Sequence, residues 1–262
     1  YDACLHYLQK AKDIRIDIPS EPFLDAQIEL ATGNFHISIQ DFEKAEECFE
    51  SAIRISRNEQ NWRTELVALS NIASIHLMKV EKQPDKALSI LTECMIIAKK
   101  KKAFHDLSRM YVMCGSAYSN MGNHLKALQL FRLAEKLFKS LPFPLHEATL
   151  QYKLARLFMN MPPSAARNSK IEHHFREAHV MTQKHEFLQL RIWVLRHWGL
   201  WLRTRKQWDR AFVLLQESYE VQQIVIGKDA QKNIKELEVQ YIATLHQKEN
   251  ELLKQQNHVL GK

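Results

Sequence analysis

Glycine, proline and strand-like patterning are all scarce in this chain. Its 262 residues contain 6 Gly and 7 Pro, and regular alternation of apolar and polar residues is nearly absent. Since a half-buried strand shows such alternation, the pattern excludes extensive sheet and favours an all-helical protein. The apolar fraction of 45% is enough for a well-packed core.

The motifs of nucleotide-binding enzymes and hydrolases are missing as well. The sequence contains no GxxxxGKS, GxxxxGKT or GxGxxG segment, and scattered glycines cannot build a phosphate-binding loop. It also contains no GxSxG, HExxH or protein-kinase motif. We therefore expect no catalytic residue and no cofactor within this stretch of chain.

Cysteine is rare and never clustered. Cys4, Cys48, Cys94 and Cys114 each stand alone on a predicted apolar helix face, and no CxxC or Cys/His metal spacing occurs. This usage is typical of reduced, buried thiols in a cytosolic protein.

The group that comes nearest to a metal site is Glu172, His173, His174 and Glu177. His173 and Glu177 are four residues apart and share one helix face, but a site needs three or four ligands. We therefore predict no bound metal, and interpret the group as a solvated helix face.

Long apolar runs are absent too. No run approaches the roughly 20 residues that cross a bilayer, so we expect no membrane association and a cytoplasmic location. The first residues, from Tyr1 to Cys4, include neither a starting Met nor the regions of a secretory signal. We expect this chain to be a piece of a longer protein.

Positive charge exceeds negative charge, with a net charge of +7 and a pI near 9.1. The densest run, Lys99 to Lys102, follows a predicted helix, where cations favour the helix dipole. Contact with phosphate or nucleic acid is the less favoured alternative, because no aromatic residues are interleaved with the lysines.

A regular pattern recurs along most of the chain. A Gly or Ala is followed three residues later by an aromatic residue, His or Leu, and a second small residue or Ile stands on the next predicted helix. The first small residues are separated by 40, 42, 40 and 44 residues; they are Gly33, Ala73, Gly115, Ala155 and Gly199. Their partners on the following helices are Ala45, Ala87, Ala127, Ile171 and Ala211.

Packing explains why two such series share one period. Two antiparallel helices approach closely only where a small side chain leaves room for the opposite backbone, and a larger side chain then fills the space beside it. Turn signals fall between the two series, at segments such as 120–123 and 161–164. The sequence therefore predicts five helical hairpins that stack along one axis.

The hairpin that runs from Cys114 through Tyr118 and Ala127 to Ala134 resembles a tetratricopeptide repeat. The resemblance covers residues 1 to about 226 and implies a right-handed α-solenoid. The period here exceeds the usual 34 residues, and such longer repeats resemble those of bacterial regulators, including peptide-sensing Rap-type proteins. The fourth hairpin departs from the others, with Pro162, Pro163 and a loop about four residues longer.

We divide the chain at Gly227. Residues 1–226 form the predicted solenoid, beginning with the second helix of an earlier hairpin, and residues 227–262 form a long helix. Two interpretations of this helix are open: a capping helix on the last repeat, or a dimerising coiled coil. The coiled coil would use Leu237, Tyr241, Leu245 and Leu252. The segment also resembles linkers that join tetratricopeptide sensors to output domains such as diguanylate cyclases or kinases.

The surface expected to bind a ligand is the concave wall, which the first helix of each hairpin lines. Counting from each small residue, we expect inward side chains one, four and five places later and three and six places earlier. Arg would bind carboxylates, Asn would pair with a peptide backbone, and Tyr or Trp would anchor apolar groups. The residues selected are Arg109, Asn120, Tyr152, Arg156, Asn160, Trp193, Arg196 and Arg203.

These features predict a non-enzymatic sensor that binds a peptide or a protein segment. Binding would change the curvature of the solenoid, and the terminal helix would pass this change to an output domain. A static scaffold for complex assembly is the alternative, and a nucleic-acid-associated regulator is a less favoured one.

Overall fold

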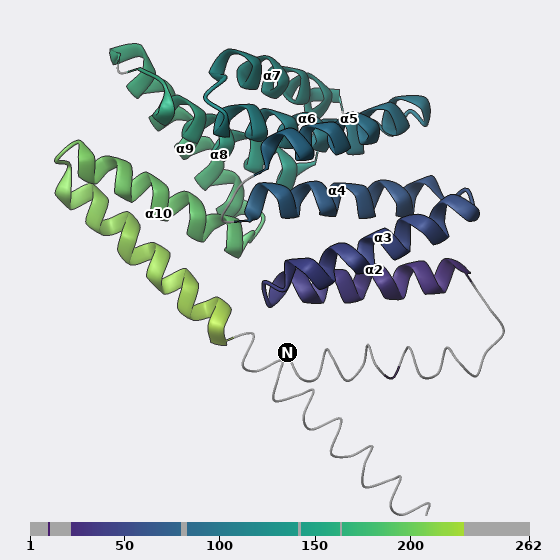
Figure 1. Ribbon diagram of the computed structural model, residues 1–262. Helices are drawn as coiled ribbons and strands as arrows, with labels where there is room; N and C mark the ends of the chain where they lie inside the picture. Colours follow the sequence, from purple (N-terminus) through teal and green to yellow (C-terminus); the bar gives the residue numbers. More distant parts are fainter. Residues whose placement is uncertain (1–9, 11–21, 80–82, 141–142, 163, 228–262) are drawn as a thin grey trace, which may run out of the picture.

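The structure is a computed structural model that describes residues 10, 22–79, 83–140, 143–162 and 164–227. Within these residues the chain is helical and contains no strand (Figure 1). The helices are α2 (Pro22–Ser38), α3 (Phe42–Asn58), α4 (Trp62–Met78), α5 (Pro84–Lys100), α6 (Phe104–Asn120), α7 (His124–Ser140), α8 (Pro144–Asn160), α9 (Ala165–Lys184), α10 (Leu188–Thr204) and a further helix over residues 208–227.

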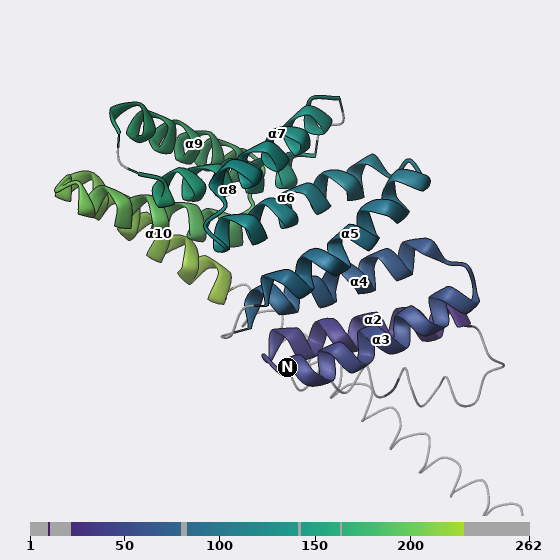
Figure 2. The same ribbon diagram turned by 45° about the horizontal axis from the view of Figure 1, so that its top comes forward.

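The helices pair into hairpins that follow one another along an axis (Figures 1 and 2). Within the hairpins α2 packs on α3, α4 on α5, α6 on α7 and α8 on α9. The second helix of each of these hairpins also packs on the first helix of the next. The even-numbered helices α2, α4, α6 and α8 contact one another in sequence, so they form one wall of the stack. The predicted all-α solenoid of hairpins is confirmed.

The small residues lie at the helix crossings, as the packing argument requires. A Cβ atom added at Gly33 would come within 2.6 Å of the Phe49 ring, and one added at Gly115 would come within 2.6 Å of Phe131 Cδ1. At Gly199 the added atom would meet Leu215 Cγ at 2.8 Å. The same offset of 16 residues separates each pair, which shows that these three hairpins share one register.

Every member of the two series is buried. The second-helix residues Ala45, Ala87, Ala127 and Ile171 are fully buried, and Ala211 is 3% exposed. Behind them the buried side chains form two large clusters, one from α2 to α6 and one from α6 to the last helix. The core is therefore a continuous strip between successive hairpins.

The fourth hairpin accommodates its extra residues mostly in a helix. Its second helix, α9, has 20 residues, whereas the other helices from α2 to α10 have 17. The connection before α9 spans residues 161–164, only one residue more than the three between α6 and α7. The prediction of a loop about four residues longer is therefore corrected: Ser164 caps α9 by accepting from Arg167 N at 3.1 Å, and the helix starts early.

One turn geometry closes six of the connections without relying on glycine. The middle residue of each three-residue connection has a positive φ; these residues are Gln40, Gln60, Lys102, Gly122, Glu186 and Lys206. The next residue donates its N–H to the carbonyl five residues earlier, as in Asn123 N to Tyr118 O at 2.9 Å. Since five of the six are not glycine, the sparse glycines of the sequence mark only one of these turns.

The thiols and the segments outside the described residues complete the outcome. Cys48, Cys94 and Cys114 are free, and burial raises the pKa of Cys94 and of Cys114 to about 12, so both remain protonated and unreactive. Cys4 lies outside the described residues. So do Leu237, Tyr241, Leu245 and Leu252, and the dimerisation assigned to them stays a prediction. No described helix has the length and apolar character needed to cross a membrane.

Candidate binding groove

A hollow of about 230 Å³ opens on the wall formed by the even-numbered helices. The end of α4 contributes Leu77 and Met78, α6 contributes Ser116, Ser119 and Asn120, and α8 contributes Lys153, Arg156 and Asn160, with Phe131 of α7 at its base. Three successive hairpins therefore build the hollow. Seven of its nine lining residues stand one, four or five places after the small residue of their helix.

The hollow combines cationic, amide, hydroxyl and apolar groups. Arg156, Asn120 and Asn160 are exposed, and no carboxylate lines the hollow. The Ser116 hydroxyl donates to Val112 O at 2.9 Å, so its oxygen can still accept. Such a set suits a ligand that carries carboxylates and peptide groups, because guanidinium and amide N–H groups donate to both.

The prediction for Tyr152 is corrected by its burial. This side chain on α8 is only 5% exposed, and its hydroxyl lies 3.2 Å from Nδ1 of His197 on α10. The corresponding positions of earlier hairpins, three before the small residue, are also buried: Leu30, Ser70 and Val112. The next even-numbered helix covers this position, so Tyr152 links two hairpins and offers no open ring to a ligand.

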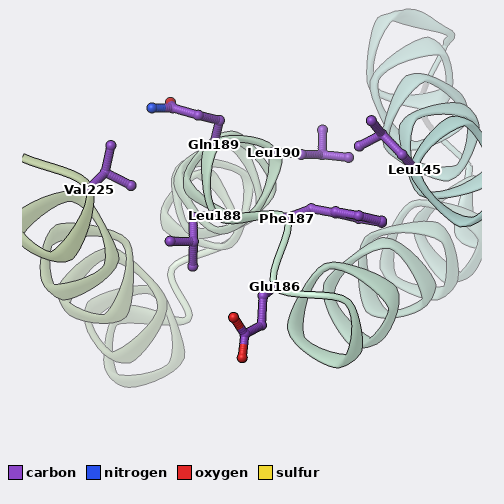
Figure 3. Close-up of a pocket in the computed structure, with 7 residues that line it drawn as sticks. All are labelled: Leu145, Glu186, Phe187, Leu188, Gln189, Leu190 and Val225. Atoms are coloured by element: carbon purple, nitrogen blue, oxygen red, sulfur yellow. The ribbon is translucent and has the colours of Figure 1, made fainter. Parts of the chain in front are cut away.

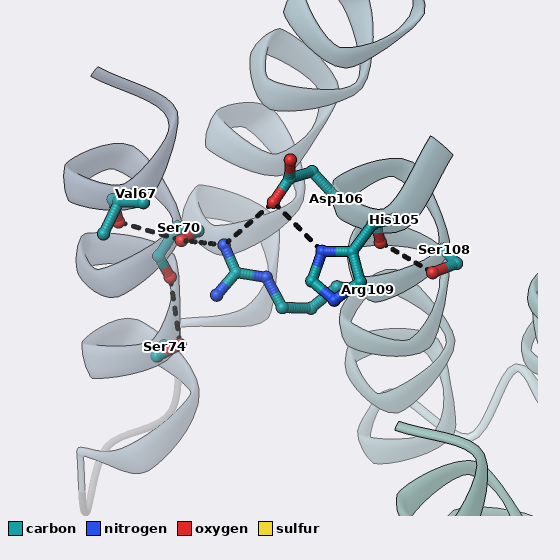
Figure 4. A network of polar contacts seen from close by, with 7 residues as sticks. All are labelled: Val67, Ser70, Ser74, His105, Asp106, Ser108 and Arg109. Atoms are coloured by element: carbon teal, nitrogen blue, oxygen red, sulfur yellow. Dashed lines mark hydrogen bonds and ion pairs between the residues drawn. The ribbon is translucent and has the colours of Figure 1, made fainter. Parts of the chain in front are cut away.

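Arg109 is also used between hairpins (Figure 4). Its Nη2 donates to the Ser70 hydroxyl of α4 at 3.0 Å and lies 3.9 Å from Oδ1 of Asp106. His105 Nδ1 is 3.7 Å from the same carboxylate oxygen. The guanidinium therefore ties α6 to α4 beside the hollow, and its charge is already partly neutralised.

The three residues predicted on α10 lie apart from the hollow. Trp193 is 52% exposed and stacks on His197, with ring centroids 6.0 Å apart. Arg196 donates to Gln222 of the last helix at 3.2 Å, and Arg203 is exposed. Of the eight predicted groove residues, the hollow thus brings together Asn120, Arg156 and Asn160.

Counting from the small residues missed Lys153. It stands two places before Ala155, between the predicted positions, yet it lines the hollow. Lys153 Nζ and the Arg156 guanidinium both lie near the Tyr152 ring, 6.0 and 5.9 Å from its centroid. The signal available in the sequence was the i,i+3 pair of cations on α8, with no acidic residue between Ala148 and Asn160.

A second hollow, of about 390 Å³, lies where the α9–α10 connection meets α8 and the last helix (Figure 3). Leu145, Phe187, Leu190 and other apolar side chains line it. The carboxylate of Glu186 points away from the leucines in Figure 3. Because no polar groups converge on it, this hollow lacks the features that orient a specific ligand.

Several histidines occupy contacts between hairpins rather than the hollow. His76 Nε2 on α4 lies 3.2 Å from Glu46 Oε1 on α3. The His146 ring on α8 lies 4.7 Å from the His105 ring on α6. Burial is the main cause that lowers the pKa of His76 and of His146, and the nearby His105 lowers that of His146 further. Both imidazoles are therefore held in the neutral form at neutral pH.

The predicted metal-like group on α9 is engaged by neighbouring helices. His174 donates from Nδ1 to Gln151 Oε1 of α8 at 2.7 Å and stacks on the Phe158 ring, and burial lowers its pKa to about 4. Glu172 accepts from Arg210 at 2.5 Å. Among the described residues, no group of three or more potential ligands could hold a metal ion.

A family model for the tetratricopeptide repeat matches residues 31–59 and 108–140. These two segments span the crossings at Gly33 and Gly115. The chain contains tetratricopeptide repeats. No curated protein sequence matches the chain.

Solved structures share the fold of these tetratricopeptide repeats. Aspartyl phosphate phosphatase F from Bacillus subtilis matches with a TM-score of 0.62 and 13% identity, over 83% of this chain and 54% of that protein. The chain thus spans about half the length of that phosphatase. BtubC from P. vanneervenii matches with a TM-score of 0.61 and 12% identity, over 86% of this chain and 91% of BtubC. The apo form of RapI matches with a TM-score of 0.60 and 12% identity, over 85% of this chain and 92% of RapI.

Proposed function

We propose that this chain is a non-catalytic module that binds an extended protein segment rich in carboxylates along the wall formed by α4, α6 and α8. The observation that carries the proposal is the hollow with Lys153, Arg156, Asn120 and Asn160 and without a lining carboxylate. Stacked helical repeats present extended concave surfaces of this kind to their partners.

The composition of the wall defines the class of ligand further. Leu77 and Met78 lie at one end of the hollow, and Met78 is 54% exposed. The cations of α8 lie at the other end. An extended peptide that places an apolar side chain against Met78 and a carboxylate against Arg156 satisfies both ends.

A change of charge at Arg156 tests this function. We use an octapeptide that alternates glutamate and leucine as the probe, and the corresponding lysine–leucine peptide as its control. Arg156→Glu is expected to weaken binding of the acidic peptide at least about 10-fold, because a repelling charge replaces a charge-assisted hydrogen bond. Fluorescence anisotropy at two salt concentrations measures the affinity.

The matched variant is Arg132→Glu, which makes the same charge change at an exposed position of α7. It is expected to leave the affinity within about twofold, since long-range effects of net charge are screened. Equal losses in the two variants, or stronger binding of the lysine peptide, would show that the α8 wall is not the binding surface.

We further propose that the module acts as a sensor, in which the bound segment favours one of two curvatures of the stack. A ligand shifts such an equilibrium only if it binds one state better than the other. Small-angle X-ray scattering of the chain with saturating acidic peptide is then expected to show a changed radius of gyration. Binding with an unchanged radius would leave a static scaffold as the function.

A further inference from the structure

The last described helix, residues 208–227, presents an apolar stripe to solvent. Trp208, Phe212, Tyr219 and Ile226 are 59%, 67%, 62% and 51% exposed. Their spacings of 4, 7 and 7 residues place them on one side of the helix. Val221 and Ala211, on the adjoining side, are buried against the fifth hairpin. The stripe is therefore a second apolar face, beside the one already packed.

In the earlier hairpins the positions of this stripe are covered. Phe212 stands one place after Ala211, and its equivalents are half-buried; they are Glu46, Leu88, Leu128 and Glu172. Tyr219 stands eight places after Ala211, and its equivalents are buried or half-buried; they are Ile53, Met95, Glu135 and His179. In each case the first helix of the next hairpin packs on that helix.

Two contacts show how the covering helix is placed. Glu46 Oε1 lies 3.2 Å from Nε2 of His76, which stands three places after Ala73. The His179 ring lies 6.1 Å from the ring of Trp198, which stands one place before Gly199. Phe212 and Tyr219 therefore face the positions that are three places after, and one place before, the small residue of a following helix.

The sequence beyond residue 227 contains this pattern at the right distance. Ala243 follows Gly199 by 44 residues, the same separation as Ala155 to Gly199. His246 stands three places after Ala243, where earlier copies have His36 and His76. Ile242 and Leu245 occupy the positions one before and two after the small residue, and both positions are buried in all five described hairpins.

We propose that residues 232–248 dock on this stripe as the first helix of a sixth repeat, with His246 against Phe212 and Ile242 against Tyr219. The even-numbered helices each begin 11 residues before their small residue, which gives residue 232 as the start. Residues 228–248 contain neither Gly nor Pro, so a 17-residue helix fits there. The occupant is this chain itself, and the proposal does not depend on the groove.

Cysteine cross-linking in the full chain tests the assigned contact. The pair is Tyr219→Cys with Ile242→Cys, in a background with Cys4→Ser and Cys48→Ser, treated with a short bismaleimide. The proposal expects a linked monomer, at a rate independent of protein concentration and at least about 10-fold above that of a control pair. The control, Tyr219→Cys with Thr244→Cys, places the second thiol on the opposite side of the same predicted helix.

Two outcomes would overturn the proposal. Equal linking of both pairs means that residues 232–248 do not dock in the assigned register. Linked dimers at a concentration-dependent rate mean that a second copy covers the stripe, as a dimerising coiled coil through Leu237, Tyr241, Leu245 and Leu252 would require.

A charge placed on the stripe gives a second measurement. Phe212→Asp in the full chain is expected to lower Tm by about 4–8 °C, because it sets a carboxylate in a covered apolar contact. Val213→Asp is the control, since Val213 is also exposed, at 61%, but lies on another side of the helix. The same Tm for both variants would show that the stripe is not covered.

Discussion

Gly115→Ala is expected to lower the free energy of unfolding by about 1–3 kcal/mol, although alanine is the better helix former. The new methyl group would come within 2.6 Å of Phe131 Cδ1. Phe131 is 1% exposed, and it cannot move aside without displacing the core between α6, α7 and α8. Urea denaturation followed by circular dichroism measures the loss.

A compensating change makes this prediction specific. The second hairpin has Ala73 and Leu91 at the corresponding positions, and both are fully buried. Adding Phe131→Leu to Gly115→Ala is therefore expected to recover part of the loss, so the two changes are not additive. The control is Gly227→Ala, because an added Cβ at Gly227 meets nothing within 4 Å. Additive effects, or an equal loss at Gly227, would contradict the packing argument.

Acidification from pH 7 to pH 4 is expected to destabilise the stack more steeply than surface charges alone would. The folded-state pKa of His174 is about 4, well below the usual 6.5, because burial disfavours the charged ring. The unfolded chain therefore binds more protons below pH 6.5, and stability falls as the pH drops from 6.5 toward 4. Burial lowers the pKa of His76, His146, His179 and His197 in the same direction.

The expected loss from His174 alone is on the order of 2 kcal/mol, less than the full shift implies because the ring is partly exposed. Tm measured between pH 7.5 and pH 4 tests this in the chain and in His174→Phe. The variant keeps an aromatic ring beside Phe158 but cannot titrate, so its Tm should fall less with acid. His173→Phe is the control, since His173 is exposed. Parallel pH profiles for the chain and His174→Phe would contradict the assignment.

The repeat architecture follows from the sequence because it depends on a local rule applied five times. A Gly or Ala at a fixed interval, with a large residue 16 positions later, determines where two helices cross, and Gly33 with Phe49 shows the result. The extra turn of α9 was not foreseen, because Pro162 and Pro163 signal a break and do not show that the following helix starts early. The positive φ at Lys102 or Glu186 has no mark in the side chains.

The groove was harder to derive, because it depends on what lies beside each helix. Positions one, four and five places after the small residue open into the hollow, which identified Asn120, Arg156 and Asn160. The position three places before it is closed by the next even-numbered helix, so Tyr152 is buried. Lys153 reaches the hollow by the length of its side chain, which spacing alone does not include.

Photo-cross-linking of a bound peptide tests the central claim, that the wall of even-numbered helices binds the partner. The glutamate–leucine octapeptide would carry one photoreactive leucine analogue, and mass spectrometry would identify the attached residues. The claim predicts attachment to α4, α6 and α8, at Leu77, Met78 and Ser119 first. Attachment confined to α3, α5 and α7 would contradict it.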